Sequence, residues 1–395
     1  MKGGGRASTL LALGILGAST PARAADEPDE IAPNFVAHGF VSQGAILSTG
    51  NNYLAKSKRG SLEFSDLGVN FTSQPTDRLR LGLQLFSRDL GPTGNYSTKA
   101  DWYYLDYRLR DWLGIRAGRV KVPLGFFNDT SDVDAAHVPI LLPQSIYPIA
   151  DRDFLLAQTG VEVYGFADLH GGGALEYRAY AGTIYIPLAN IPGATEIDVP
   201  YLVGGRVIWE TPLQGLRVAL SGQALRLNLK YPVPATATMP MATSATLGLD
   251  VQLGVASVEY VHRDLTLVAE LSQWRLDVDA ATIAVSPAGT KKVTVSERAY
   301  LLVHDHVNRW FWPGAYYSVL FPDEAKATFS GASQDMQHDV AGTLRFDVNA
   351  HWLVKLEGHW MHGTAGADGT LNANVPLGML TRDWAVFLAK TTAYF

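Results

Sequence analysis

Apolar and polar residues alternate along most of the sequence after about residue 35. In residues 78–88, leucine stands at positions 79, 81, 83 and 85, and mostly polar residues or glycine stand between them. Successive side chains of a strand point to opposite faces, so this pattern indicates a strand with one apolar and one polar face. The pattern recurs, most clearly in residues 103–110, 175–181, 265–272, 339–347 and 352–360, and predicts an all-β chain of about 16 strands.

The connections between the predicted strands alternate in length. Short ones lie at 74–77, 110–112, 170–173, 212–215, 262–264, 307–309 and 349–351, and long ones at 50–58, 89–99, 123–156, 184–200, 228–244, 277–292, 322–336 and 363–382. Short turns at one end and long loops at the other are typical of a transmembrane antiparallel β-barrel with short periplasmic turns and long extracellular loops. A soluble sandwich or propeller also alternates, but its exposed face is polar and its two rims need not differ in loop length.

The two predicted faces differ in chemistry. The polar face repeatedly holds opposite charges, whereas the apolar face is rich in Leu, Tyr and Trp. In a membrane barrel the apolar face points to lipid, and aromatic side chains gather at the two interfaces. The residues suited to these positions are Tyr103, Tyr107, Tyr177, Trp209, Tyr260, Trp352 and Trp360.

The amino terminus predicts export. Lys2 and Arg6 precede an apolar run at 10–16, and the small-residue stretch 22–24 follows it. This order is typical of a secretory signal peptide, here residues 1–24, which leaves residues 25–395 as one barrel domain. The sequence has no Cys, so no disulfide can stabilise the exported chain, and its net charge of -6 argues against a nucleic-acid partner.

The connection at 123–156 is the longest and has neither helical nor strand periodicity. Its interior carries prolines at 139, 143 and 148 and the acidic residues Asp129, Asp132 and Asp134. So long an aperiodic stretch is usually a functional loop, a linker or disorder. Its apolar run at 138–143 needs a surface to pack on, so we expect a loop folded into the barrel lumen.

Two stretches resemble known outer-membrane proteins. Residues 383–395 alternate and end on Phe395, as the last strand of Gram-negative outer-membrane barrels does. Residues 118–125 resemble the Gly-x-x-Lys-x-Pro-x-Gly stretch of the phosphate-selective porin-like group, without the obvious Arg and Lys ladder of a phosphate channel. The mature chain thus resembles outer-membrane porins of about 16 strands.

The resemblance implies a passive diffusion channel for small hydrophilic solutes in the bacterial outer membrane, in contact with lipid and lipopolysaccharide and assembled as a homotrimer. The 123–156 loop would narrow the lumen, with its carboxylates facing the pore and basic wall residues opposite. The wall candidates are Arg80, Arg88, Arg108, Arg116, Arg119 and Lys121. Alternatively, all these charges only keep the lumen hydrated, or the channel selects anions or dicarboxylates.

An outer-membrane barrel enzyme is the alternative of another class. Such a lipase needs Ser and His within hydrogen-bond reach, yet Ser272 and His359 lie on different predicted strands and no Gly-x-Ser-x-Gly motif occurs. His304 and His306 would share a strand face, but no third ligand is near, so a solvated pair is the better interpretation than a metal site. No cofactor is expected.

Overall fold

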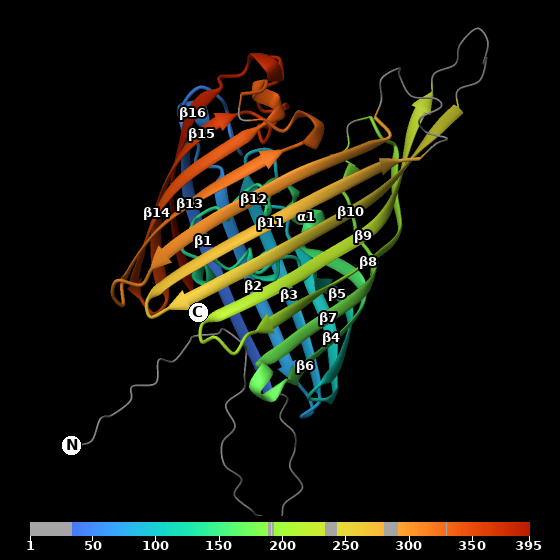
Figure 1. The fold of residues 1–395 in the computed structure, drawn as a ribbon, viewed down its shortest axis with the longest axis vertical. Helices are drawn as coiled ribbons and strands as arrows, with labels where there is room; N and C mark the ends of the chain where they lie inside the picture. Colours follow the sequence, from blue (N-terminus) through green and yellow to red (C-terminus); the bar gives the residue numbers. More distant parts are fainter. Residues whose placement is uncertain (1–33, 189–190, 192, 234–242, 280–290, 329) are drawn as a thin grey trace, which may run out of the picture. The chain divides into compact units, whose positions relative to one another are not determined.

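The computed structural model describes residues 34–188, 191, 193–233, 243–279, 291–328 and 330–395, and within them sixteen strands form one closed sheet (Figure 1). The strands are β1 (Asn34–Ser48), β2 (Phe64–Gln74), β3 (Leu79–Leu90), β4 (Lys99–Arg110), β5 (Leu113–Lys121), β6 (Ala157–Asp168), β7 (Ala174–Thr183), β8 (Glu196–Glu210), β9 (Leu216–Val233), β10 (Thr243–His262), β11 (Leu265–Val278), β12 (Val293–Asp305), β13 (Phe311–Phe321), β14 (Gln337–Asn349), β15 (Trp352–Gly363) and β16 (Asp383–Tyr394).

Each strand pairs with its sequence neighbours, and β1 pairs with β16 to close the barrel. The ladders are antiparallel; in the closing one, Phe40 lies opposite Tyr394 and Ser48 opposite Val386. The connections alternate in length as predicted, from short turns such as 111–112 and 263–264 to the longest connection, 122–156. The predicted fold class, a transmembrane antiparallel barrel of about 16 strands, is confirmed.

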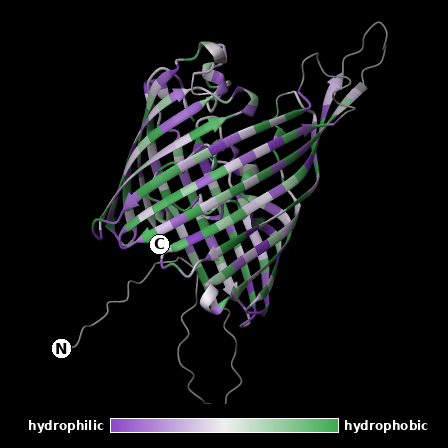
Figure 2. Ribbon diagram, viewed as in Figure 1, coloured by the Kyte–Doolittle hydropathy of each residue, from purple (hydrophilic) through white to green (hydrophobic). Residues whose placement is uncertain are grey.

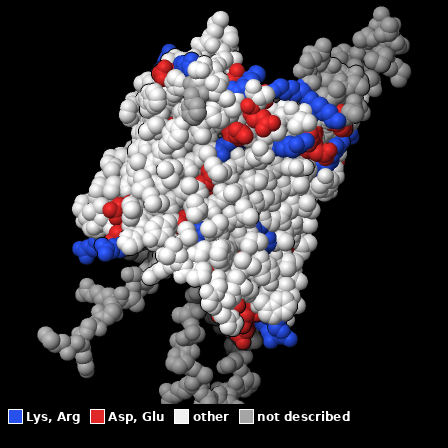
Figure 3. Space-filling model, viewed as in Figure 1, with Lys and Arg blue, Asp and Glu red and all other residues white. Residues whose placement is uncertain are grey.

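The outer face of the barrel is apolar. Leu220, Leu271 and Leu301 are more than half exposed on this face. Glu270 and Lys355, which lie on the inner face of the sheet, are fully buried. Hydropathy alternates along the strands in Figure 2, and in Figure 3 the charged side chains gather mainly at the two ends of the barrel. A closed sheet with this surface satisfies its backbone in lipid, so the protein spans the bacterial outer membrane.

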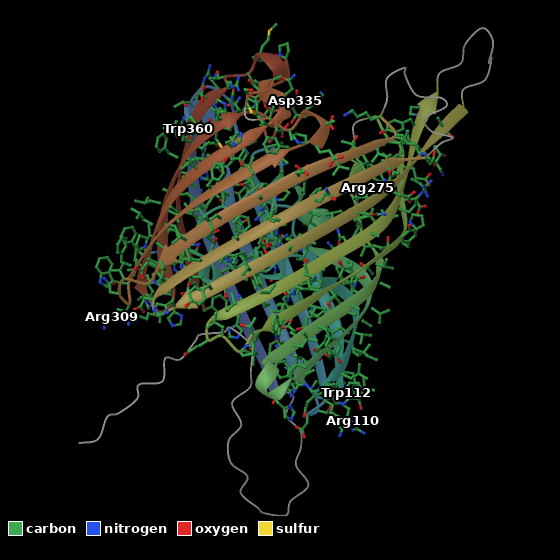
Figure 4. All side chains as sticks on the ribbon, viewed as in Figure 1. Arg110, Trp112, Arg275, Arg309, Asp335 and Trp360 are labelled. Atoms are coloured by element: carbon green, nitrogen blue, oxygen red, sulfur yellow. The ribbon has the colours of Figure 1, made fainter. Side chains whose placement is uncertain are left out.

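Aromatic side chains mark both ends of this apolar band. Trp360 lies toward the end with the long connections, and Trp112 lies at the end with the short turns (Figure 4). Several predicted interface residues, including Tyr103, Trp209 and Trp352, are indeed exposed on the outer face.

Helical structure is limited to short pieces. They are α1 (Arg152–Leu155) and the 3-10 turns η1 (Ser57–Arg59), η2 (Asn128–Thr130), η3 (Asp134–Ala136), η4 (Ile149–Asp151), η5 (His170–Gly172), η7 (Glu324–Lys326), η8 (Ser333–Asp335) and η9 (Leu377–Met379). In the part of the chain that the structure describes, no helix has the length and apolarity to cross a bilayer. The predicted signal peptide, residues 1–24, lies outside the described residues.

The main departure from the predicted strands is at β9 and β10. Residues 228–244 are predicted as a long loop, but β9 continues to Val233 and β10 begins at Thr243. Alternation continues through residues 225–231, and pairing of the backbone groups along this added length favours extended strands over a loop.

Candidate functional site

The connection between β5 and β6, residues 122–156, lies against side chains that point into the barrel; we call it the β5–β6 segment. The Glu357 carboxylate on β15 accepts hydrogen bonds from the backbone N–H groups of residues 140 and 141, at 2.6 and 3.0 Å. Glu270 on β11 accepts one from the backbone N–H of Phe126 at 2.8 Å. Since β11 and β15 lie on different parts of the closed sheet, the segment reaches across the interior.

Basic side chains bind the backbone carbonyls of the same segment. Lys355 Nζ donates to the carbonyls of residues 134 and 139 at 2.8 and 3.0 Å. Arg345 Nη1 donates to those of residues 135 and 137 at 2.7 and 3.1 Å, and Arg206 Nη1 donates to that of residue 125 at 3.0 Å. These wall residues satisfy backbone groups that would otherwise be buried without partners.

Local contacts shape the segment. Asn128 Nδ2 donates to the carbonyls of Val122 and Leu155, both at 2.9 Å, and so ties the two ends together. Gly125 has φ of +56°, and a Cβ there would lie 2.2 Å from the hydroxyl oxygen of Tyr147. Only glycine fits this turn without displacing the segment.

The apolar residues of the segment pack in two clusters. Leu142, Ile146 and Tyr147 join buried residues of β8–β12, and residues 140–141 join a second cluster with Phe64 of β2 and residues of β1, β15 and β16. The predicted apolar run at 138–143 therefore packs on the inner wall, on two sides.

The three acidic residues of the segment form ion pairs with the wall or within the segment. Asp129 Oδ2 lies 2.8 Å from Arg178 Nη1 on β7 and 3.3 Å from Arg206 Nη2 on β8. Asp132 Oδ1 lies 2.6 Å from Lys121 Nζ at the end of β5, and its other oxygen lies 3.3 Å from Arg152 Nη2 in α1.

Asp134 is bound to β16. Its Oδ2 lies 2.9 Å from Lys390 Nζ and accepts a hydrogen bond from Thr392 Oγ1 at 2.6 Å. Lys390 Nζ also lies 2.9 Å from Asp66 Oδ2 on β2, so one ammonium group joins two carboxylates.

The sequence predicts that Asp129, Asp132 and Asp134 face the pore opposite basic wall residues. In the structure each of these carboxylates is in direct contact with a cation. A carboxylate removed from water is stable only with a counter-charge or hydrogen bonds in contact. The three residues fasten the segment to the wall.

The surroundings shift the pKa values of these groups. Burial alone would raise the pKa of Asp129, but Arg206 and Arg178 outweigh it and hold this pKa below its usual value. Burial is likewise outweighed at Asp134, where Lys390 and Lys355 lower the pKa of the carboxyl group. Burial lowers the pKa of His137 to about 4, and the neutral ring donates from Nε2 to the Thr130 carbonyl at 2.8 Å.

Three of the six predicted basic wall residues are in ion pairs that differ in their partners. Lys121 binds the segment, whereas Arg88 and Arg116 bind wall carboxylates: Arg88 Nε lies 2.6 Å from Asp66, and Arg116 lies 3.0 Å from both Asp106 and Glu162. Such pairs line the lumen with charges that compensate one another.

The remaining three predicted wall residues have other environments. Arg119 Nε donates to the Asp101 carbonyl at 2.7 Å. Arg80 Nη2 is buried without a hydrogen-bond partner among the described residues, and Arg108 is exposed near the short turns. Residues that fasten the segment but are absent from the predicted set include the carboxylates Glu270 and Glu357 and the basic residues Arg152, Arg178, Arg206, Arg298, Arg345, Lys355 and Lys390. Alternation places Arg178, Arg206, Arg345 and Lys355 on the lumen face, but no sequence pattern reveals their partners.

The histidines have structural contacts. Within the described ranges, no group of three or more His, Cys, Asp or Glu side chains is placed to hold a metal ion. His306 stacks on Trp312 with ring centroids 3.7 Å apart. Both ring nitrogens of His359 are bound by carboxylates, Asp339 and Glu357, each at 2.9 Å.

No protein-family model matches the sequence, and no curated protein matches it. Among solved structures, OmpT of Vibrio cholerae is similar at 14% identity, with a TM-score of 0.59, over 93% of this chain and 99% of that chain. An anion-selective porin from Comamonas acidovorans is similar at 12% identity, with a TM-score of 0.57, over 92% of this chain and 100% of that one. The chain has the porin fold.

Two further similarities agree with this fold. The outer-membrane channel DcaP of Acinetobacter baumannii shares 11% identity, with a TM-score of 0.52, over 94% of this chain and 100% of that chain. One similar structure of Vibrio cholerae OmpT is described as a trimer form. The resemblance to porins of about 16 strands is thus confirmed as a likeness of fold, and what this porin-like barrel does must be argued from its own contacts.

Proposed function

We propose that the protein is a passive diffusion channel for small hydrophilic solutes across the outer membrane, with the β5–β6 segment as its constriction. One observation carries the proposal: a long segment, fastened by ion pairs and hydrogen bonds, crosses the interior of a closed barrel of sixteen strands. Barrels of this size leave a lumen wide enough for water, and a segment inside it sets the size of the solutes that pass.

The constriction is then bordered by the residues that fasten the segment and by other charged residues of the barrel wall. Asp129, Asp132 and Asp134 lie on the side of the segment. The basic residues that border the constriction on the wall are Lys121, Arg88, Arg178 and Arg206, and Arg116 and Arg119 lie nearby on β5. Arg80 and Arg108 belong to the part of the wall toward the short turns. Most of these charges are paired, which favours general sieving over a strong ion preference.

Catalysis is not part of the proposal. A barrel enzyme of the Ser-His kind needs a histidine free to take a proton from a nucleophile. His359 has carboxylates on both ring nitrogens, and the Ser272 hydroxyl accepts a hydrogen bond from Trp274 Nε1 at 3.1 Å. The trimeric form of one similar protein supports a homotrimer here, surrounded by lipid and lipopolysaccharide.

Single-channel conductance in a planar bilayer tests this function. We compare the wild type, a deletion of residues 129–142, and the double variant Glu270→Gln and Glu357→Gln, which removes two carboxylates that hold the segment. Glu196→Gln is the matched control, because Glu196 pairs with Lys230 2.8 Å away at an exposed site.

Stable conductance steps in the wild type are expected, with larger or noisier steps in the deletion and the double variant and unchanged steps in the control. If correctly folded wild-type protein gives no steps, the channel proposal is wrong. If steps appear but neither segment variant changes them, the segment is not the constriction.

A further inference from the structure

The polarity of the sheet is inverted near the long-connection ends of β9, β10 and β11. Leu227 pairs with Leu249, which pairs with Val278, and all three point inward. On the outer face at the same level, Arg226 pairs with Asp250 at 2.9 Å. Figure 3 shows charged side chains over this end, and Arg275 is placed there in Figure 4. An outer face with ion pairs lies above the hydrocarbon, so this inner wall belongs to the extracellular vestibule.

An apolar inner wall is unusual for a vestibule that admits only hydrophilic solutes, because it places apolar surface next to water. Part of the wall is covered: Ile184 and Val199 from the β7–β8 connection and strand β8 belong to the same apolar cluster. Other side chains of the wall are only partly buried, namely Val251, Trp274, Leu276 and Val278.

An arginine without a carboxylate partner stands beside this partly buried strip. Arg298 on β12 points inward, opposite Ser272, and its guanidinium carbon lies 3.4 Å from the ring centroid of Trp274. Nε donates to Ser296 Oγ and Nη1 to the Ser145 carbonyl, both at 3.1 Å. Among the residues that the structure describes, no carboxylate lies within 4.0 Å of this guanidinium.

Arg298 thus differs from most of the basic residues that surround the β5–β6 segment. Arg178 and Arg206 each contact two carboxylates, whereas Arg298 has two neutral acceptors and an aromatic face. Asp151 of the β5–β6 segment interacts electrostatically with Arg298 but lies beyond 4.0 Å of its guanidinium group. A largely buried cation with no carboxylate in contact can bind an anion at its free edge. Because Ser145 belongs to the β5–β6 segment, this charge stands directly at the extracellular side of the constriction.

We propose that Arg298 and the Trp274 strip form a binding subsite for amphipathic monocarboxylates. The carboxylate of the ligand would bind the edge of the guanidinium group that the hydrogen bonds to Ser296 and Ser145 leave unoccupied. The apolar body of the ligand would lie on Trp274, Leu276 and Val278. These strip residues span about 13 Å along β11, since a strand rises about 3.3 Å per residue, which suits an aryl-alkyl or medium-chain body. The inference rests on the proposed channel function and names a solute class for it.

The chemistry distinguishes this class from other anions. A dicarboxylate or inorganic phosphate gains most from several cations, and here one unpaired cation adjoins an apolar surface. A small monocarboxylate such as acetate can use Arg298 but not the strip. The affinity for an aryl-alkyl acid should therefore exceed that for acetate or succinate.

The test measures binding of 3-phenylpropionate, acetate and succinate by calorimetry to protein in lipid nanodiscs, and current block by the same acids in planar bilayers. The wild type is expected to bind 3-phenylpropionate at least tenfold more tightly than acetate or succinate. Arg298→Gln and Trp274→Ala should each weaken this binding at least fivefold, and Arg298→Lys should weaken it less than Arg298→Gln. Arg275→Gln is the control, because Arg275 pairs with Asp277 on the outer face.

Equal affinity for the three acids, tighter binding of succinate, or wild-type binding by Arg298→Gln would overturn the subsite. Folding of each variant is checked by heat-dependent electrophoretic mobility, and Arg298→Lys keeps the test valid if Arg298→Gln does not fold. Calorimetry does not require conduction, so absence of KCl steps together with selective binding would reject the channel and retain the subsite. Conductance steps in KCl without selective binding of 3-phenylpropionate would retain the channel and reject the subsite.

Discussion

Replacing Asp129 by Asn tests whether the anchored carboxylates border the ion path. The Asp129 side chain keeps 20% of its exposure, with Arg178 at 2.8 Å and Arg206 at 3.3 Å. Burial acts to raise its pKa, but the two arginines lower the pKa below its usual value, so the group is ionised at pH 7. The amide has nearly the same volume, and the substitution removes one negative charge from the constriction, which changes the net charge there by +1.

The expected effect follows from Coulomb's law. In water, a unit charge about 10 Å from a permeating ion changes the energy of that ion by about 0.4 kcal/mol, with opposite signs for anion and cation. The two changes together raise the anion-to-cation permeability ratio about fourfold. Screening at 0.1 M salt, where the Debye length is about 10 Å, reduces the effect to about 1.7-fold.

The assay is the reversal potential across a tenfold KCl gradient. Asp129→Asn should shift it toward anion preference, and the shift should grow as total salt is lowered. Asp277→Asn is the control, since this carboxylate also pairs with an arginine, Arg275, at 2.8 Å but on the outer face. A reversal potential equal to that of the wild type, or a shift toward cations, would refute the assignment of Asp129 to the constriction.

Three further predictions follow from other contacts. Burial lowers the pKa of His137 to about 4, below its unfolded value of about 6.5. The neutral ring therefore stabilises the seated segment above pH 6.5 by about 3 kcal/mol, and this contribution is lost as the pH falls to 4. Single-channel conductance should change between these two pH values in the wild type, and should change less in His137→Gln. Gly125→Ala would place its Cβ 2.2 Å from the Tyr147 hydroxyl and should lower the unfolding temperature seen by electrophoretic mobility, whereas Gly171→Ala, with nothing within 4 Å, should not. Leu271→Arg, on an outer position that is 65% exposed, should destabilise the barrel by about 2–4 kcal/mol in urea titrations in lipid, and Gln252→Arg, on the polar outer face above it, should not.

Each of these has a result that contradicts it. A His137→Gln variant with the wild-type pH profile would mean that another group controls the segment in acid. Equal stability of the two glycine variants would mean that the turn at Gly125 adapts. Equal costs at Leu271 and Gln252 would place the membrane boundary higher than the polarity of the outer face indicates.

The sequence predicts the barrel well because the side-chain period of a strand is local. Each alternating stretch shows which of its residues lie on the apolar face and which on the polar face, and the stretches between them give the order of short and long connections. The number of strands and the topology can therefore be predicted without knowledge of distant contacts. The extended ends of β9 and β10 escape prediction because polarity there inverts: inward Leu227 and Leu229 still alternate with outward Asn228 and Lys230. In a barrel with a polar lumen, the leucines of such a pattern are expected to face the lipid and the polar residues to face the lumen, which is the opposite of the observed arrangement.

The site is less predictable because its contacts join segments far apart in the chain. Alternation places Arg178 on the lumen face, but its partner Asp129 lies in an aperiodic segment whose position depends on many contacts at once. Lys390 lies 256 residues from Asp134, and only the closure of β1 on β16 brings it there. Arg152 lies within the segment itself, where no periodicity assigns a direction to its side chain.

The fastening of the β5–β6 segment has a consequence for the order of assembly. Its partners Lys355, Glu357 and Lys390 lie on β15 and β16, the last two strands of the barrel in chain order. These contacts join parts of the chain that are more than 200 residues apart. The segment therefore cannot reach all its contacts before β15 and β16 are in place, which makes its seating a late step of folding with a high loop-closure cost.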